Sequence, residues 1–291
     1  MTGQAVYKQG WTLDDVQWSS FDPSKAEPWM IAAIKAAALV EFNAPDYVSY
    51  LKRVFKDAGP ATLDAIEQWG CEESQHGRAL GRWAEMADPT FKLDDAFARF
   101  RAGYTPEHFA TVENQSIRGS RRGEMIARCV VESGTSSYYS AIRDATEEPV
   151  LKEIAGRIAA DEYRHYKLFY DTLQAQDEPD LPFWKKLMVA IGRVTESDDD
   201  ELAYAYYCAN VSAAEAPATP YDRAHFSRLA TQTGMRIYRR NHINKLVQMV
   251  AKVVGAAPHG RLSKLGGALL WRMLRLRAGS AAPREMAAVP A

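Results

Sequence analysis

The order of apolar and polar residues predicts helix along almost the whole chain. Ala, Leu, Glu, Arg and Lys are abundant, and stretches in which β-branched and polar residues alternate are scarce. Breaks in the helical pattern occur where glycine or proline punctuates it, as at Gly59-Pro60 and Asp88-Pro89. We therefore predict an all-α fold.

Four long helices are expected in the first part of the chain, at about 24–57, 61–87, 119–145 and 147–175. Pro45 lies inside the first and should kink its axis, because proline cannot donate to the carbonyl four residues back. A short helix is expected after Thr105-Pro106, and the clearest later helix covers about 220–254. The chain then divides into an N-terminal extension (1–23), a bundle (24–176), helices that complete the same domain (177–279) and a tail expected to be disordered (280–291).

The four long helices carry a repeated pattern of glutamates and histidines. A lone glutamate is followed about thirty residues later by Glu-x-x-His, and the same pair of motifs then occurs again. Residues three apart lie on one face of a helix, so the glutamate and the histidine of each motif can bind one metal ion together. A four-helix bundle that holds two iron or manganese ions requires this set of ligands. The six candidate ligands are Glu41, Glu73, His76, Glu132, Glu162 and His165.

The alternative is that these six residues belong to solvated helix faces. One Glu-x-x-His would carry little weight in a chain with six histidines, but two copies, each preceded by a spaced glutamate, are much harder to explain by chance. If the six faced the core without a partner, burial of their charges would be costly. The pattern therefore favours a metal site.

Composition narrows the class of protein. The 291 residues carry a formal net charge of −1, which gives no indication of nucleic-acid binding. No apolar run reaches the length of a membrane span, and residues 1–22 lack a signal-peptide pattern. The three cysteines, Cys71, Cys129 and Cys208, form no CxxC pair, which argues against a disulfide framework, a zinc ribbon or a built-in iron–sulfur centre. We expect a cytoplasmic protein.

Positive charge is concentrated at the C-terminal end. From Lys252 onward there are seven basic residues and one acidic residue, Glu285. Within residues 259–277, leucines and a tryptophan are mixed with lysines and arginines, as in a basic amphipathic helix. Such a helix can pack on its own domain, contact a membrane surface or bind an acidic partner, and the sequence leaves these three open.

At the candidate ligands the chain resembles the soluble acyl-ACP desaturases, a family of ferritin-like di-iron enzymes. The resemblance implies a ferritin-like four-helix bundle with additional C-terminal helices. Residues 177–291, which would shape the substrate cavity, give no clear match, so the resemblance bears on the fold more than on the substrate. Four motifs within about 25–175 carry it: Glu-x-x-x-Pro-x-Tyr at Glu41–Tyr47, Trp-x-x-Glu-Glu-x-x-His-Gly at Trp69–Gly77, Glu-x-x-Thr at Glu132–Thr135 and Asp-Glu-x-Arg-His at Asp161–His165.

The resemblance also implies roles for residues at the site. The six candidates would ligate two iron ions, although manganese or a mixed pair suits the same ligands. Thr135 would lie over the oxygen-binding face and pass a proton, Asp161 would accept a hydrogen bond from a ligand histidine, and Arg164 would pair with a neighbouring carboxylate. The family is dimeric and takes electrons from a separate ferredoxin, so a homodimer and an external electron donor are expected.

The function that follows from the resemblance is O2-dependent removal of hydrogens from a fatty acyl group bound to an acidic acyl carrier protein. One alternative is a di-iron oxygenase, a hydroxylase or N-oxygenase, on another substrate, because the same metal site serves both reactions. A ferritin-like iron-oxidising protein without organic substrate is disfavoured by the extra hundred residues after the bundle, and a scaffold without metal by the presence of all six ligands.

Other residues near the ligand helices have plainer interpretations. Four aromatic residues could line a substrate pocket, but side chains of this kind more often form the core: Trp69, Tyr138, Tyr139 and Phe169. Cys71 and Cys129 are expected to be small buried residues. Three histidines are expected to be surface or core residues rather than ligands: His108, His225 and His242.

Overall fold

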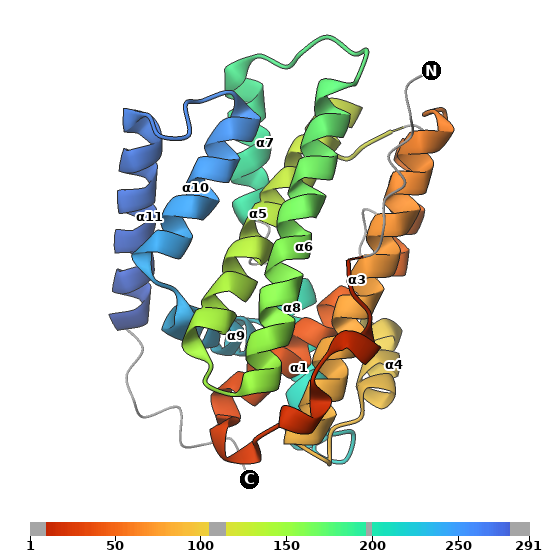
Figure 1. Ribbon diagram of the computed structural model, residues 1–291, viewed down its shortest axis with the longest axis vertical. Helices are drawn as coiled ribbons and strands as arrows, with labels where there is room; N and C mark the ends of the chain where they lie inside the picture. Colours follow the sequence, from red (N-terminus) through yellow and green to blue (C-terminus); the bar gives the residue numbers. More distant parts are fainter. Residues whose placement is uncertain (1–9, 105–114, 196–199, 280–291) are drawn as a thin grey trace.

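A computed structural model describes residues 10–104, 115–195 and 200–279 (Figure 1). Every regular element in these ranges is a helix, which confirms the predicted all-α class. The expected short helix after Thr105-Pro106 and the expected tail 280–291 lie outside the described residues. The helices are α1 (Pro28–Phe42), α2 (Ala44–Val54), α3 (Pro60–Ala87), α4 (Leu93–Gly103), α5 (Arg121–Ala145), α6 (Pro149–Gln174), α7 (Phe183–Thr195), α8 (Asp200–Asn210), α9 (Arg223–Ile237), α10 (Arg240–Val254) and α11 (Arg261–Gly279).

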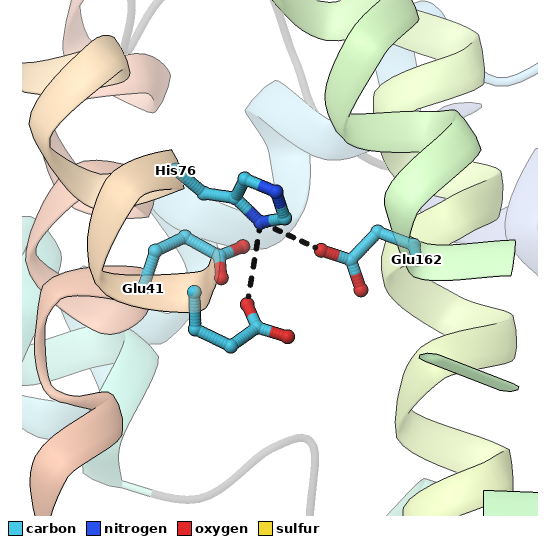
Figure 2. Close-up of side chains that lie close together, drawn as sticks. Glu41, His76 and Glu162 are labelled. Carbon is cyan, nitrogen blue, oxygen red and sulfur yellow. Dashed lines mark ion pairs between the residues drawn. The ribbon is translucent and has the colours of Figure 1, made fainter. Parts of the chain in front are cut away.

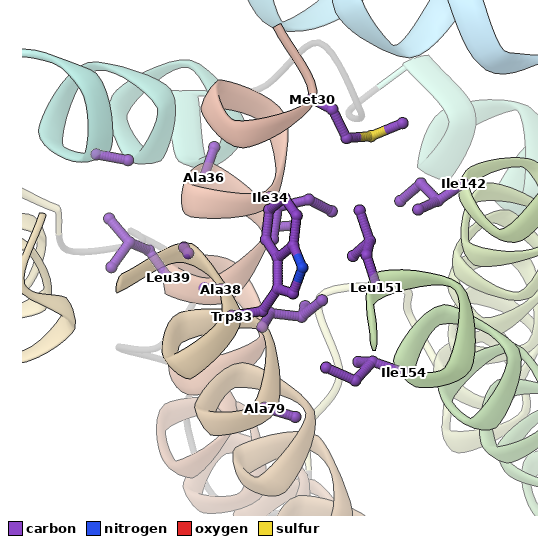
Figure 3. Packing of buried hydrophobic residues seen from close by; sticks show 14 of the residues in the cluster. Met30, Ile34, Ala36, Ala38, Leu39, Ala79, Trp83, Ile142, Leu151 and Ile154 are labelled. Carbon is purple, nitrogen blue, oxygen red and sulfur yellow. The ribbon is translucent and has the colours of Figure 1, made fainter. Parts of the chain in front are cut away.

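The helices that carry the candidate ligands pack side by side. α5 and α6 form a hairpin closed by three residues, and α1 lies against α3 (Figure 1). The two pairs meet where α3 contacts α6. Their interface is apolar near the end of the bundle, where Ile34 of α1 and Trp83 of α3 face Leu151 and Ile154 of α6 (Figure 3). Burial of these side chains is the main force that holds the two pairs together.

A single buried carboxylate fixes the start of α6 within this core. Glu148 is fully buried and accepts hydrogen bonds from the backbone N–H groups of Val150 and Leu151. The indole Nε1 of Trp83 also donates to Glu148, at 2.6 Å. The carboxylate therefore caps α6, where negative charge is favourable, and ties that cap to α3.

The first predicted helix is interrupted rather than kinked. α1 ends at Phe42 and α2 begins at Ala44, with Asn43 between them at φ −81° and ψ 2°. Pro45 occupies the first turn of α2, where its missing N–H needs no partner. The break at Asn43 therefore comes two residues after Glu41, so this candidate ligand lies in the last turn of α1.

The single helix predicted for about 220–254 is wrong. α9 ends at Ile237 and α10 begins at Arg240, because Tyr238 and Arg239 have extended backbone. The Tyr238 ring packs against the rings of Tyr138 and His242. Tertiary packing rather than glycine or proline accompanies this break, which explains why the sequence pattern does not mark it.

The remaining segments pack around the ligand helices. α8 lies against α1, α10 lies against α5, and α11 lies against α10. Before α1, the chain forms three short 3₁₀ turns (Leu13–Asp15, Trp18–Ser20 and Pro23–Lys25), and Trp11 and Val16 are buried in the main core. None of the described helices is long and apolar enough to cross a membrane.

Candidate metal centre

The structure brings all six candidate ligands to one place inside the bundle. All six are buried, and they come from four helices: Glu41 from α1, Glu73 and His76 from α3, Glu132 from α5, and Glu162 and His165 from α6. Figure 2 shows Glu41 and His76 approaching Glu162 from the opposite side of the bundle. Periodicity explains the convergence within each helix, since the glutamate and the histidine of each motif are three residues apart.

The six residues form two overlapping groups, each of which could hold a metal ion. In each group the potential ligand atoms lie within 4.8 Å of one another. Two glutamates, Glu73 and Glu162, belong to both groups, whereas each lone glutamate belongs to only one. The groups are Glu41, Glu73, His76 and Glu162, and Glu73, Glu132, Glu162 and His165.

Distances around the histidines agree with this division. Nδ1 of His76 lies 3.4 Å from Oε2 of Glu73 and 3.3 Å from Oε1 of Glu162. Nδ1 of His165 lies 3.0 Å from Oε1 of Glu73 and 3.6 Å from Oε2 of Glu132. The two oxygens of Glu73 therefore face different histidines, as in a carboxylate that bridges two sites.

Each histidine is oriented by the acidic residue that directly precedes the other Glu-x-x-His motif. Nε2 of His76 donates to Oδ2 of Asp161 at 2.9 Å, and Nε2 of His165 donates to Oε2 of Glu72 at 2.8 Å. A carboxylate can only accept here, so Nε2 carries a proton and Nδ1 faces the centre, where the neutral ring would offer its lone pair to a metal ion. Asp161 precedes the ligand Glu162, and Glu72 precedes the ligand Glu73, so the two contacts are reciprocal.

Asp161 is itself held by two further groups. The indole Nε1 of Trp11 donates to Oδ2 of Asp161 at 2.7 Å, and the guanidinium of Arg164 forms an ion pair with Oδ1. The Trp11 ring also stacks over the His76 ring, with centroids 6.2 Å apart. Sequence reasoning missed Trp11, because it lies in a non-helical segment 150 residues from Asp161 and belongs to no motif.

Two hydroxyl groups contact ligand carboxylates directly. Oγ1 of Thr135 donates to Oε2 of Glu162 at 2.5 Å, which places this residue beside the centre. The hydroxyl of Tyr139 donates to Oε1 of Glu41. Tyr139 lies two helical turns after Glu132 on the same face of α5, and this spacing is the signal that could have found it. Both contacts restrict how the ligand carboxylates can rotate.

Burial and mutual repulsion dominate the electrostatics of the lone glutamates. Burial raises the pKa of Glu41 and of Glu132 well above the usual value, and the carboxylates of Glu73 and Glu162 raise it further. Burial acts in the same direction on Glu73, but the adjacent His165 and His76 outweigh it and hold the Glu73 pKa well below the usual value.

The histidines respond in the opposite sense. Burial disfavours the imidazolium, but the carboxylates around each ring outweigh burial and raise the pKa of His76 and of His165 well above the usual value. Among the groups that raise the pKa of His76, the hydrogen-bonded Asp161 has the largest effect. The charge of Glu73 has the largest such effect on the pKa of His165. Protons on the imidazoles thus offset part of the negative charge, a role that a bound cation would take over.

The donor atoms at the centre fit a metal ion. Several buried atoms have no hydrogen-bond partner among the described residues: Nδ1 of His76 and of His165, both carboxylate oxygens of Glu132, and Oε1 of Glu162. Buried polar atoms are normally paired, and an unpaired carboxylate is costly. Carboxylate oxygens and imidazole nitrogens are ligands that metal ions such as iron and manganese accept. The buried cluster can therefore hold metal.

Residues outside the centre mostly follow the plainer expectations. Trp69 and Phe169 pack edge to face in a second core cluster, with ring centroids 5.5 Å apart. Tyr138 packs against the main core. Cys129 is buried as expected, whereas Cys71 is exposed because it lies on the outer face of α3, two residues before Glu73.

The other histidines have local roles. The Asp222-x-x-His225 spacing is that of a helix cap, since Oδ1 of Asp222 accepts from the backbone N–H of His225 at 2.9 Å. His242 is buried and lies 3.0 Å from Oδ2 of Asp144. His108 lies outside the described residues.

Two sequence comparisons, with models of protein families and with curated proteins, give no relative. A scan against models of protein families finds no match, and a search of curated proteins finds no similar sequence either. The resemblance to the desaturases therefore depends on the four motifs, and the activity of the chain is a matter for proposal.

Proposed function

We propose that this chain binds two iron ions and is an O2-dependent oxidoreductase of the ferritin-like class, similar to the soluble acyl-ACP desaturases. Its substrate is a fatty acyl group presented on an acyl carrier protein. The observation that carries the proposal is the sharing of Glu73 and Glu162 between two ligand groups that each have their own histidine. One metal ion would need neither the second histidine nor a shared carboxylate.

Charge supports two divalent ions. The centre contains four carboxylates that are each at most 9% exposed, and two divalent cations would balance them without further counter-ions. Asp161 and Glu72 lie one step further out, where each accepts a hydrogen bond from a ligand imidazole. Such outer carboxylates raise the basicity of the histidine and fix its ring, which strengthens metal binding.

Two ferrous ions in this centre would supply the electrons for reducing O2, which is the chemistry needed to take hydrogen from an unactivated C–H bond. The protein contributes the surroundings. The hydroxyl of Thr135 is placed to hold or move a proton at Oε2 of Glu162, 2.5 Å away. The buried walls of the bundle exclude water from the same volume.

The desaturase-like part of the proposal rests on the order and spacing of the four motifs. Asp161 and Thr135 occupy positions to which the resemblance assigns roles at the site. Asp161 contacts the candidate ligand His76, and Thr135 contacts the candidate ligand Glu162. Cys129 and Cys208 are buried on different helices and Cys71 is exposed, so the described cysteines form no cluster. We therefore include a separate electron donor such as ferredoxin in the proposal. A homodimeric state is included because the resemblance to the desaturases implies it.

The proposal is tested by metal content per chain, followed by single-turnover O2 consumption of the ferrous protein with and without a long-chain acyl carrier protein. Two irons per chain, acyl-stimulated O2 use and an unsaturated product by mass spectrometry are expected. A hydroxylated product, or a rate of O2 consumption that does not change when the acyl carrier protein is added, would overturn the desaturase assignment. Neither result would contradict the proposed metal centre. Absence of bound iron or manganese would overturn both.

A further inference from the structure

Two helices in the second half of the chain hold large apolar side chains that solvent reaches. On α11, Leu262, Leu265, Leu269 and Met273 are 70%, 57%, 59% and 42% exposed. Their spacing of three, four and four residues places them in one stripe along the helix. α7 has a similar stripe, in which Trp184 and Met188 are 60% and 61% exposed. Contiguous apolar surface of this kind marks a contact with something else.

The packing of α11 on α10 leaves several leucines of α11 exposed to solvent. α11 meets α10 through small residues: an added Cβ at Gly266 would lie 3.6 Å from Cγ1 of Val247 in α10. At Gly267 an added Cβ would lie 2.8 Å from Oδ1 of Asn244, so the two helices approach closely at this glycine. α11 has large apolar residues on more than one face: Leu270, Trp271 and Leu274 are half-buried, whereas Leu262, Leu265, Leu269 and Met273 remain exposed. A helix that only covers a core would leave no such exposed stripe.

The same region is strongly basic. Between Arg223 and Gly279 there are twelve lysines and arginines and no aspartate or glutamate. On α11 the apolar stripe is accompanied by exposed Arg261, Lys264, Arg272 and Arg275. α10 contacts both α7 and α11, and both of these helices begin at the same end of the molecule (Figure 1). Both helices that carry an exposed stripe therefore pack against α10.

We propose that α11, together with α7, docks the protein onto the surface of a membrane that contains anionic lipid. The apolar stripes lie at the boundary between headgroups and acyl chains, and the basic side chains contact lipid phosphates. A helix that lies in the interface needs no spanning length, which is consistent with the lengths and composition of the described helices. This inference is independent of the proposed function.

Charge selects this occupant over a second copy of the chain. A symmetric dimer through α11 would place the same basic residues opposite one another, with no acidic residue from Arg223 to Gly279 to neutralise them. An acidic protein would satisfy the charges, but Trp184 and the leucine stripe would still need an apolar partner surface. An anionic bilayer offers negative headgroups and an apolar layer directly beneath them.

The test is co-sedimentation of the full chain with vesicles of phosphatidylcholine alone, or of equimolar phosphatidylcholine and phosphatidylglycerol. We expect binding to the anionic vesicles that weakens with salt, and little binding to phosphatidylcholine alone. Leu265→Ser/Leu269→Ser should weaken vesicle binding about tenfold or more, because the apolar contacts are lost. Arg272→Gln/Arg275→Gln should weaken it and flatten its salt dependence.

The control is Tyr163→Ser, which removes a side chain that is 57% exposed on α6, outside the proposed surface. It should bind vesicles like the unchanged protein. Circular dichroism should show that all variants keep the helical fold, because every replaced side chain is exposed. Equal binding of Leu265→Ser/Leu269→Ser and the unchanged protein would overturn the proposal. Absence of vesicle binding by the unchanged protein would also overturn it. If the leucine variant then converted a dimer to a monomer, the occupant of this surface would be a second copy of the chain.

Discussion

Oε1 of Glu73 lies 3.0 Å from Nδ1 of His165, although Glu73 belongs to the motif of the other histidine. Its second oxygen, Oε2, lies 3.4 Å from Nδ1 of His76. One carboxylate of α3 thus serves both halves of the centre. The lone glutamates are placed differently, since Glu41 and Glu132 each belong to one ligand group only.

This sharing predicts different metal stoichiometries for two variants. Glu73→Gln should abolish binding at both positions, because an amide is a weaker ligand than a carboxylate at each. Glu132→Gln removes a ligand from one group only, so about one ion per chain should remain under conditions that load two. Metal analysis after gel filtration measures both. The matched control is Glu67→Gln on α3, whose exposed carboxylate pairs with Lys52 at the surface. Equal metal loss in Glu73→Gln and Glu132→Gln would refute the sharing.

Asp161→Asn tests the orientation of His76. Asparagine keeps the shape, but it loses the charge that stabilises the imidazole and can present an N–H to Nε2 instead. We expect metal affinity to fall about 10- to 100-fold, as is typical when a carboxylate partner of a ligand histidine is lost. Competition with a chelator gives the affinity. Asp171→Asn on the same helix, where the carboxylate is exposed and pairs with Lys167, should bind metal normally.

Thr135→Val separates the role of the hydroxyl from that of the metal ligands. Valine fills the same space but cannot donate to Oε2 of Glu162. Metal content should be unchanged, whereas the fraction of consumed O2 that appears as organic product should fall. Thr172→Val on α6 is the control, since its hydroxyl bonds only to the carbonyl of Leu168 in its own helix. An unchanged coupling ratio in Thr135→Val would remove this residue from the chemistry.

Gly77→Ala tests how α1 is held near α3. A Cβ at position 77 would lie 2.6 Å from the backbone nitrogen of Phe42, the residue that follows Glu41. Relief of this overlap pushes α1 away, so we expect a loss of about 1–3 kcal/mol in the free energy of unfolding and weaker metal binding. Chemical denaturation with and without metal measures both. Gly134→Ala in α5 meets nothing within 4 Å and should instead stabilise by about 0.5–1 kcal/mol.

The pKa shifts predict that the melting temperature of the metal-free protein depends on pH and that the melting temperature of the metal-loaded protein does not. The pKa of His76 and of His165 is raised well above the unfolded value of about 6.5. A raised pKa gives stability that is fully present below the unfolded pKa and is lost as pH rises through the folded pKa. The melting temperature of the metal-free protein should therefore fall as pH rises above about 6.5.

The raised pKa of Glu41 and of Glu132 acts in the same direction, whereas the lowered pKa of Glu73 matters only in acid. Bound metal replaces these protons, so the loaded protein should keep its melting temperature over this range, and loading should release protons. Differential scanning calorimetry and titration calorimetry in two buffers test these statements. A metal-free melting temperature that rises with pH above neutrality would contradict them.

The pairing of candidate ligands within each motif was predictable because it depends on residues close together in the sequence. Glu73 and His76 are three residues apart, as are Glu162 and His165, and helical periodicity alone places each pair on one face. The long helices were likewise marked by apolar periodicity and by punctuation such as Gly59-Pro60. The break between α9 and α10 was not, because Tyr238 is extended where neither glycine nor proline precedes it.

The sequence does not indicate how the α1–α3 pair and the α5–α6 pair face each other. Sharing of Glu73 and Glu162 depends on that arrangement, as does the exchange in which Asp161 orients His76 and Glu72 orients His165. An acidic residue directly precedes the glutamate of each Glu-x-x-His motif, and this repetition in the sequence could have indicated that these acids orient the histidines. Trp11 offers none, since it reaches Asp161 from a segment without periodicity.

Both ligand groups draw on α6, the last of the ligand helices to be synthesised. One group takes Glu162 from it, and the other takes Glu162 and His165. A nascent chain that has emerged only as far as α5 therefore presents neither set of ligands in full. Metal binding at this centre would therefore have to follow the docking of α6, and a metal ion that met the growing chain earlier would find no complete set of ligands.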